Sequence, residues 1–409
     1  MSRAGRTEKE EPRGGNGYRA SVPPGARRAR VKRLPIAAAI LVAVCAWPAG
    51  PQDLKVAVLA PLSGHASAFG VSTREGALLA IQRWNARGGV LGRRIQAIVE
   101  DSQCGEPPAA SVAAKVIRQD NVHYIIGEVC SAASIPISGV ANAARVIQIS
   151  PASTEPALTV DSAGRTKTYV FRACFVDPFQ GIFGASFAVR NLNAQTAFLI
   201  VNNANSYSKG LAEYFEISFR TQGGRIVGRE TYSYPDTDFS AILSRVKAAR
   251  PDLIYLPDSY AVANLVTRQA RQLGMRIPFL GGDGWDSSEL DMEAADGSYF
   301  TTHFSPEDPR PAVQSFLSVY GAAYKDEKGN PKIPDAIAVL AFDATNLLLQ
   351  AIRNAGTDDT DRVRDALEAI HYDAVSGTIS FDIQHNPEKP AVVLAVRSGK
   401  ARYFALVTP

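Results

Sequence analysis

The sequence has few residues that could build a metal centre or a catalytic nucleophile–base pair. Its 409 residues include five scattered histidines and four cysteines, and none of them falls at metal-ligand spacing. No G-x-S-x-G turn, phosphate-binding glycine loop or dinucleotide fingerprint occurs. The sequence therefore predicts no metal, no cofactor and no enzymatic activity.

An excess of positive charge is also missing from most of the chain. The formal net charge is +4, from 44 Lys and Arg and 40 Asp and Glu. Residues 1–50 hold ten of the basic and three of the acidic residues, so the remainder has three more acids than bases. The basic balance belongs to an N-terminal tail and gives no support for a nucleic-acid partner.

That tail is typical of an export signal. A basic stretch at 27–33 precedes an apolar run at 34–47, whose length suits a signal peptide and is short for a membrane span. Cleavage after Ala46 is expected, and a lipid anchor on Cys45 is the alternative. We find no later apolar run of about 18 residues, so we expect an exported, soluble chain, periplasmic or at the cell surface.

Export bears on the cysteines, because cysteines outside the cytoplasm pair. Cys104 follows a strand-like segment at 95–101, and Cys130 follows another at 122–128, with a helix-like stretch between them. This arrangement puts both cysteines at the C-terminal ends of parallel strands. It predicts a disulfide that stabilises the fold by roughly 3–4 kcal/mol, with two free buried cysteines as the alternative. Cys174 is predicted to be a free core thiol.

Strand-like and helix-like segments alternate through two blocks of the chain. Repeated βα units predict an α/β architecture of parallel sheets flanked by helices, and the length allows two such lobes. The first helix is expected to start at a capping box of Ser72 and Glu75. The predicted strands lie at 95–101, 122–128, 146–150, 170–175, 196–202, 225–232, 252–257 and 277–281, after one in LKVAVLAPLSG and before short terminal ones. The predicted helices after the first lie at 107–119, 134–145, 179–192, 208–222, 239–249, 261–273, 309–325, 335–354 and 360–370.

The loops after the strands suit a small polar ligand. Ligands of open α/β sheets bind at the carboxyl ends of the strands, where helix N-termini offer free N–H groups. These loops are rich in Ser, Thr, Tyr and Gly and carry one or two acids, which favours hydrogen-bonded capture over catalysis. They are PLSGHASAFG, EVCSAAS, SPASTEP, NNANSYSKG, PDSYAVAN and GGDGWDSSEL.

Three long segments occur in an order and at a spacing that a known family shares. They are AAKVIRQDNVHYIIGEVCSAASIPIS, QISPASTEPALT and TRQARQLGMRIPFLGGDGWDSSEL. Together they resemble the branched-chain amino acid binding proteins of bacterial ABC importers, from about Leu54 to beyond Phe300. The resemblance implies the two-lobed type I periplasmic binding protein fold, with three crossovers forming a hinge. The implied lobes are 51–172 plus 303–373 and 173–302 plus 374–409, after a lead-in and signal peptide at 1–50.

The resemblance also assigns roles to loop residues. Ser131, after the second cysteine, would hold a ligand's α-carboxylate with its hydroxyl and backbone N–H. The Ala152 carbonyl and the Thr154 hydroxyl would hold the ammonium, Asp283 would pair with its charge, and Tyr207 would add an aromatic from the second lobe. The alternatives are an N-cap for Ser131, a cap or turn residue for Thr154 and Asp283, and a surface tyrosine for Tyr207.

The aromatic walls of the implied site depart from the family pattern. Phe69 matches one wall, with a core residue as the alternative. Where the family often has tyrosine after the strand DLIYLPD, counting gives Ser259, with Tyr260 beside it. A one-residue shift would restore the tyrosine; otherwise this wall is smaller and more polar, and the ligand's side chain stays open. Asp283 is one methylene shorter than the glutamate of some members.

The resemblance thus implies a monomeric binding protein for an amino acid, branched-chain or related, that serves the permease and ATPase subunits of an ABC importer. The alternative is a sensor of the same fold that serves a receptor or regulator, or that binds a small molecule other than an amino acid.

Overall fold

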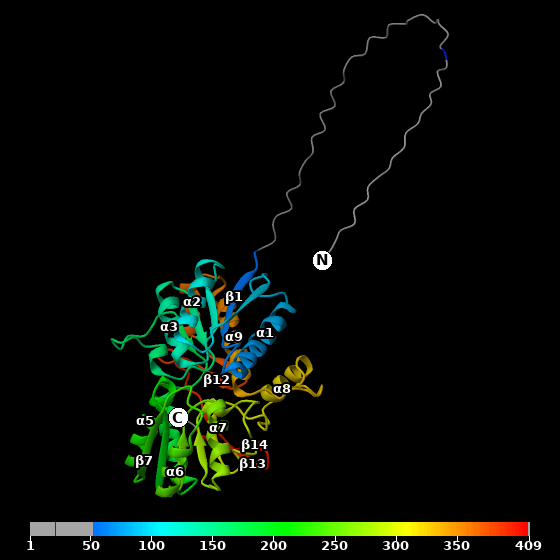
Figure 1. Ribbon diagram of the computed structural model, residues 1–409. Coiled ribbons are helices and arrows are strands. Elements are labelled where there is room, and N and C mark those ends of the chain that lie inside the picture. Colours follow the sequence, from blue (N-terminus) through cyan, green and yellow to red (C-terminus); the bar gives the residue numbers. More distant parts are fainter. Residues whose placement is uncertain (1–20, 22–51, 408–409) are drawn as a thin grey trace, which may run out of the picture. The chain divides into compact units, whose positions relative to one another are not determined.

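The computed structural model describes residue 21 and residues 52–407, so the predicted signal peptide and Cys45 lie outside the described residues. Two large sheets with flanking helices make up most of residues 52–407 (Figure 1). The five strands of the first sheet are all parallel. Their order is β2 (Ile95–Asp101), β1 (Leu54–Ala60), β3 (Tyr124–Gly127), β4 (Ile147–Ser150) and β5 (Val170–Arg172).

The second sheet has seven strands and mixed pairing. Its β6 to β10 are parallel, whereas β13 and β14 add at one edge in antiparallel pairing. The α/β prediction is therefore confirmed, while the expectation of purely parallel sheets is wrong for the last two strands. The order is β14 (Lys400–Val407), β13 (Ala391–Arg397), β10 (Tyr299–Thr302), β9 (Phe279–Gly281), β8 (Leu253–Leu256), β6 (Thr196–Asn202) and β7 (Arg225–Tyr232).

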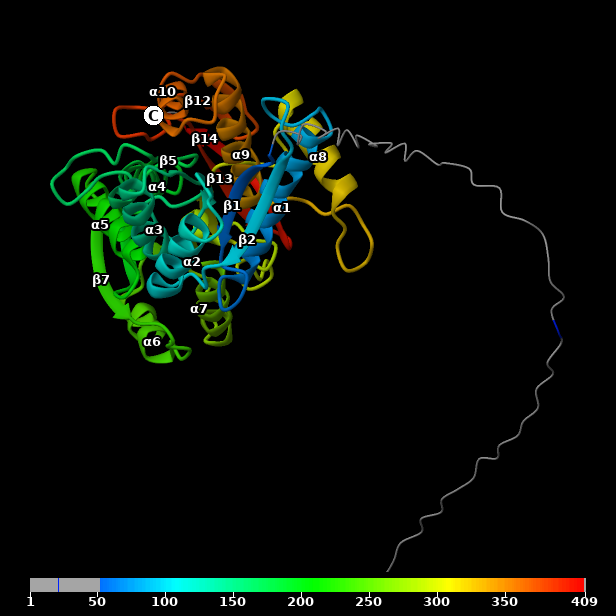
Figure 2. The same cartoon turned by 90° about the horizontal axis from the view of Figure 1, so that it is seen from above.

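Helices cover both faces of each sheet, because alternate strand residues point to opposite faces. In β1, Val56 and Val58 share a core with α1 and α9, and Ala57 and Leu59 share another with α2 and α3. Figure 2 shows α1 and α2 on opposite sides of β1. The helices of this lobe are α1 (Ser67–Asn85), α2 (Glu106–Arg118), α3 (Ser131–Ala143), α8 (Pro311–Ala323), α9 (Ala336–Ala355) and α10 (Thr360–Glu368).

The second sheet is covered in the same way. Leu199 packs with α4 and α5, and Ile200 packs on the opposite face with α6 and α7. The helices of this lobe are α4 (Asp177–Arg190), α5 (Ser206–Thr221), α6 (Ser240–Ala249) and α7 (Tyr260–Gln272). The remaining elements are two 3₁₀ turns, η1 (Pro156–Leu158) and η2 (Asp283–Trp285), and a two-stranded sheet of β11 (Tyr372–Ala374) and β12 (Gly377–Ile379).

The chain crosses between the lobes three times. It leaves the first sheet after β5, returns after β10 to α8 and α9, and enters the second sheet again at β13. Helix α9 packs along α1 in the first lobe. The carboxyl ends of β1, β3 and β4 and those of β6, β8 and β9 lead into the loops that line one cavity.

The capping box predicted for the first helix is wrong. Helix α1 starts at Ser67, five residues before Ser72. The Ser72 hydroxyl donates to Asp335 at 2.6 Å, and Lys332 donates to Glu75 at 2.8 Å. Both side chains therefore hold α1 against the segment before α9 instead of capping the helix.

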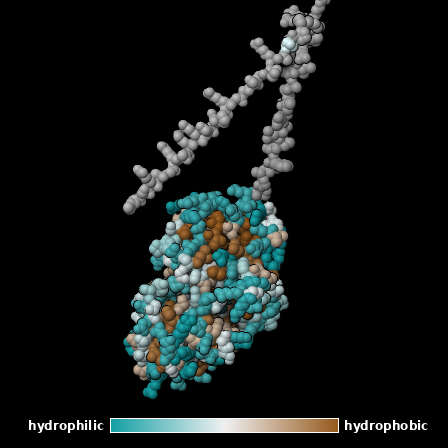
Figure 3. Space-filling model, turned by 45° about the vertical axis from the view of Figure 1, so that its right-hand side comes forward, coloured by the Kyte–Doolittle hydropathy of each residue, from teal (hydrophilic) through white to brown (hydrophobic). Residues whose placement is uncertain are grey.

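One helix also corrects the expectation that no later run could span a membrane. Helix α9 is long and apolar enough by length and composition, but 78% of its most apolar 18-residue window is buried inside the protein. The apolar run of α9 was not predicted from the sequence because Asp343, Gln350 and Arg353 interrupt it. The molecular surface shown in Figure 3 is mostly hydrophilic, with apolar residues in separate patches.

Candidate ligand-binding site

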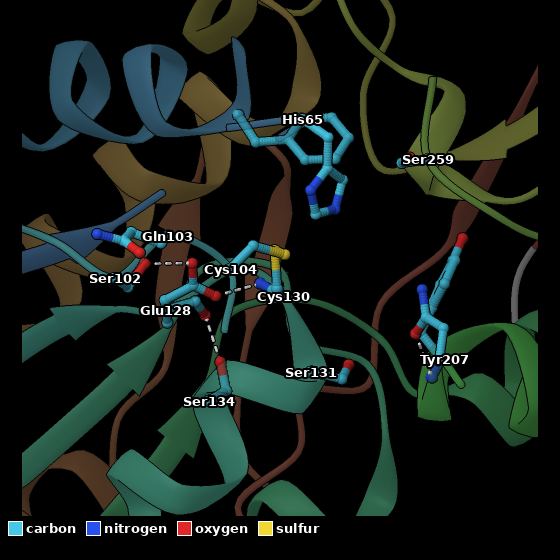
Figure 4. Close-up of a disulfide and its surroundings, with 12 residues drawn as sticks. His65, Ser102, Gln103, Cys104, Glu128, Cys130, Ser131, Ser134, Tyr207 and Ser259 are labelled. Atoms are coloured by element: carbon cyan, nitrogen blue, oxygen red, sulfur yellow. Dashed lines mark hydrogen bonds between the residues drawn. A yellow bond between two sulfur atoms is a disulfide. The ribbon is translucent and has the colours of Figure 1, made fainter. Parts of the chain in front are cut away.

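A cavity of about 230 Å³ lies between the carboxyl ends of the two sheets. Its volume fits a small molecule. Figure 4 shows Ser131 and His65 of the first lobe on one side of this space, and Tyr207 and Ser259 of the second lobe on the other. Six of the eight predicted binding residues line it, namely Phe69, Ser131, Ala152, Tyr207, Ser259 and Asp283.

The other two predicted residues, Thr154 and Tyr260, do not line the cavity. Thr154 is fully buried, and its Oγ1 has no hydrogen-bond partner. The Tyr260 ring packs edge-on against Phe69 at 5.0 Å, and its hydroxyl accepts from the Ala68 N–H at 3.3 Å. Tyr260 thus joins the lobes beside the cavity, and Ser259 leaves this wall small and polar.

A disulfide links Cys104 and Cys130, with their Cα atoms 5.5 Å apart, and Cys174 is free and buried, as predicted. The two preceding strands are not neighbours, however, because β1 lies between β2 and β3. The bridge therefore joins two loops across the carboxyl end of β1 (Figure 4).

Ser131 is the first residue of α3, which starts three residues earlier than predicted. The first N–H groups of a helix have no partner within the helix, and its N-terminus carries partial positive charge. The Ser131 hydroxyl lies 3.2 Å from that of Ser153, which donates to it. Ser131 and the start of α3 can therefore bind an anion in the cavity.

Glu128 supports this turn from inside the first lobe. Its side chain is fully buried and accepts hydrogen bonds from the Ser102 hydroxyl at 2.8 Å and from the Cys130 N–H. Its backbone carbonyl accepts from the Ser134 hydroxyl at 2.7 Å (Figure 4). The same carbonyl accepts from the Ser150 hydroxyl at 2.6 Å. Burial raises the pKa of Glu128 to about 8, although the hydrogen bonds oppose that rise.

This raised pKa predicts a decline of stability with pH. Folded Glu128 keeps its proton to a higher pH than the unfolded chain does, so stability is full below about 4.5 and falls towards pH 8. The folding equilibrium constant should decrease by at most about tenfold per pH unit. Glu128→Gln mimics the protonated acid, so its stability relative to the parent should rise over this range. Urea unfolding of both proteins at pH 5, 7 and 9 measures the difference; a difference that is constant with pH contradicts the prediction.

Asp283 is the acidic group of the second lobe that the sequence predicted at the cavity. It is 4% exposed, and its Oδ1 accepts from the Tyr207 hydroxyl at 2.9 Å and from Gln180 at 3.1 Å. Its Oδ2 lies 3.1 Å from Nε2 of His303. Burial lowers the pKa of His303 to about 4, so this ring is neutral near pH 7 and its Nε2–H donates. The Asp283 carboxylate thus accepts hydrogen bonds from three neutral donors, and none of these three partners is a cation.

Tyr207 is held in place by its own helix start. Asn205 caps α5, and its side-chain oxygen accepts from the Tyr207 N–H at 3.1 Å. The Tyr207 hydroxyl also accepts from the Gly284 N–H at 3.2 Å. This tyrosine therefore links the start of α5 to the turn that carries Asp283.

Several lining residues were not predicted from the sequence. They include a second acid. All but Tyr234 lie in loops that the sequence marked as ligand-binding, namely PLSGHASAFG, NNANSYSKG and PDSYAVAN, but the sequence did not show which side chains of those loops face the cavity. Within residues 52–407, no group of three or more His, Cys, Asp and Glu side chains is placed to hold a metal ion. The missed lining residues with polar side chains are His65, Asn202, Asn205, Tyr234 and Asp258.

Comparisons with known proteins match the chain over most of its length. The family model described as periplasmic binding protein matches residues 53–401. A leucine-, isoleucine-, valine-, threonine- and alanine-binding protein of Pseudomonas aeruginosa is 27% identical over 355 residues, which are 86% of this chain and 92% of that protein. A Leu/Ile/Val-binding protein of Rhizobium johnstonii, BraC3, is 30% identical, over 81% of this chain and 88% of its own length.

Solved structures share the fold. The leucine-binding protein LivK of Thermotoga maritima has a TM-score of 0.80 at 35% identity and covers 87% of this chain and 99% of its own. LivJ of Streptococcus pneumoniae, a branched-chain amino acid transporter substrate-binding protein in complex with isoleucine, has a TM-score of 0.80 at 31% identity. It covers 87% of this chain and 100% of its own.

Proposed function

Because the chain belongs to the periplasmic binding protein family, we propose that it captures an amino acid between its lobes and delivers it to an ABC importer. The ligand class, branched-chain or related, follows the names of the relatives in Pseudomonas and Rhizobium. Both are named as binding proteins, which supports a carrier and not an enzyme.

One observation carries this proposal: the cavity offers complementary groups for both charges of a zwitterion. The first lobe supplies Ser131 and the start of α3 for a carboxylate, and the second lobe supplies Asp283 for an ammonium. A water-poor cavity must satisfy both charges or lose their hydration energy. Ala152 lines the same cavity, and we assign its carbonyl to the ammonium. Thr154 is fully buried outside the cavity lining and takes no part in this assignment. The Phe69 ring would pack against the ligand's side chain.

We place the lobe boundaries at 51–172 with 303–373, and at 173–302 with 374–409. This division follows the two sheets and the packing of α9 on α1. The three crossings between the lobes would act as the hinge. We further propose an exported monomer, in the periplasm or at the cell surface, with a permease and ATPases as partners.

Ligand binding should close the two lobes. Groups for the ligand come from both lobes, so their contacts exist together only in the closed state. A ligand well above its Kd stabilises the folded protein by a few kcal/mol. We therefore expect leucine, isoleucine, valine or a related amino acid to raise Tm in a thermal-shift panel. Small-angle scattering with that ligand should give a smaller radius of gyration. If no amino acid shifts Tm, the proposed function is wrong.

A further inference from the structure

The cavity contains a second buried acid that the proposed amino-acid site does not use. Asp258 follows β8 by two residues, lines the cavity, and is 3% exposed. Its Oδ2 accepts from the Tyr232 hydroxyl, and its Oδ1 accepts from the Ser259 N–H at 2.7 Å. Both donors are neutral, so neither balances the charge of an ionised carboxylate.

The two acids of the cavity serve different parts of it. Along the sheet edge the strands run β7, β6, β8, β9 and β10. Asp258 turns towards Tyr232 at the end of β7, whereas Asp283 turns towards His303, directly after β10. A single ammonium at Asp283 would therefore leave Asp258 facing another part of the ligand.

The surroundings of Asp258 are polar on the side of the cavity. Ser259 lines the cavity beside it, and its Oγ is buried without a hydrogen-bond partner. Asn202 and His65 line the same region from β6 and from the first lobe. Of the described residues that line the cavity, none is a lysine or an arginine. Two acids thus face the ligand, and burial raises the pKa of Asp258. A simple zwitterion brings only one cation to compensate their charges.

The position of the neighbouring Tyr260 leaves room in the cavity for a polar end of the ligand's side chain. Tyr260 does not enter the cavity, because its ring packs on Phe69 and its hydroxyl donates to the His65 carbonyl at 3.2 Å. Ser259 therefore lines this part of the cavity. A large aromatic ring in its place would fill the space that the end of a ligand's side chain can occupy. Burying a carboxylate is costly unless it is hydrogen-bonded and its charge is compensated.

We propose that Asp258 and Ser259 bind a hydrogen-bond donor at the end of the ligand's side chain. The preferred ligand is then an amino acid with an O–H or N–H group there, a cationic one fitting the two acids best. This inference rests on the proposed function, because it places the α-ammonium at Asp283.

Calorimetry on the parent protein tests this preference with pairs of similar shape. Threonine replaces a methyl group of valine by a hydroxyl, and lysine extends the chain of norleucine with an ammonium. We expect at least one donor-bearing ligand to bind tenfold or more tightly than its apolar partner. The inference is overturned when neither does, while the proposed function stands as long as valine or norleucine binds. If none of the four binds, the inference is also overturned, and the thermal-shift panel of amino acids decides the proposed function separately.

A variant locates the preference at Asp258. Asp258→Asn should lower the ratio of lysine to norleucine affinity by about tenfold or more and leave norleucine binding within about threefold. Asp286→Asn is the control, because Asp286 is a partly buried acid of the same lobe that accepts a hydrogen bond from Thr302 but does not line the cavity. An equal loss for all ligands in Asp258→Asn would make Asp258 a structural residue and overturn the assignment. The parent comparison decides the preference even where the variant does not fold.

Discussion

Alanine at position 76 is expected to destabilise the first lobe on the order of 3 kcal/mol, at the upper end of overpacking effects. Gly76 lies in the middle of α1, where that helix crosses α9. A Cβ added there would lie 2.1 Å from the backbone oxygen of Ala338 and 2.9 Å from its carbonyl carbon. Backbone atoms cannot rotate away, so the two helices would have to separate, and the core they share with the first sheet would open.

Gly139 provides the matched control for this substitution. It also lies inside a helix, α3, but it is exposed and a Cβ would meet nothing within 4 Å. Alanine is intrinsically better than glycine in a helix by about 1 kcal/mol. Gly139→Ala should therefore be neutral or stabilising in urea unfolding, whereas Gly76→Ala should lower the free energy of unfolding despite the same gain. Equal effects at both positions would show that the helix contact is not tight.

The α/β alternation was predictable because it depends on local hydrophobic patterns, and most predicted elements lie within a few residues of the observed ones. Two kinds of feature were not predictable. The start of α1 was misplaced because Ser72 and Glu75 find partners more than 250 residues away, at Asp335 and Lys332. The short strand β10 was missed because its four residues are a strand only through pairing with β9 and β13.

The binding site also contains residues that the sequence could predict and one that it could not. The sequence marked Ser131 and Asp283 because a recognisable motif surrounds each residue. It did not mark Asp258, although it quoted the loop PDSYAVAN that contains this acid. Its role depends on strand order, because β8 lies between β6 and β9 and so turns the acid towards Tyr232 and the cavity. Strand order in a sheet is a tertiary property that no local pattern carries.

Removing the charge of Asp283 is expected to weaken amino-acid binding by about 2–4 kcal/mol, which is roughly 30- to 700-fold in Kd. This is the range for a buried charge pair broken on one side. The carboxylate already accepts from the neutral donors Tyr207, Gln180 and His303. In the proposed complex the ligand's ammonium would be its cationic partner, so the lost attraction would fall on binding.

Asparagine can take this position without disrupting the surrounding hydrogen bonds. Its Oδ1 can accept from Tyr207 and Gln180 as the carboxylate does. Its amide N–H₂ would face Nε2 of His303, and that ring can move its proton to Nδ1, which has no partner in the structure. Asp283→Asn should therefore fold, and unfolding curves should separate its effect on binding from any effect on stability.

Ser131→Ala serves as the comparison, because the carboxylate has more support than the ammonium. The start of α3 remains after the hydroxyl is removed, so we expect a loss nearer 1–2 kcal/mol, as for one hydrogen bond to a charged group. Calorimetry with an amino acid and its deaminated analogue distinguishes the two variants. The analogue should bind poorly to the parent and lose little more in Asp283→Asn, because it has no ammonium to lose. If Asp283→Asn binds the amino acid as tightly as the parent does, Asp283 is not the counter-charge and the cavity receives a different class of ligand.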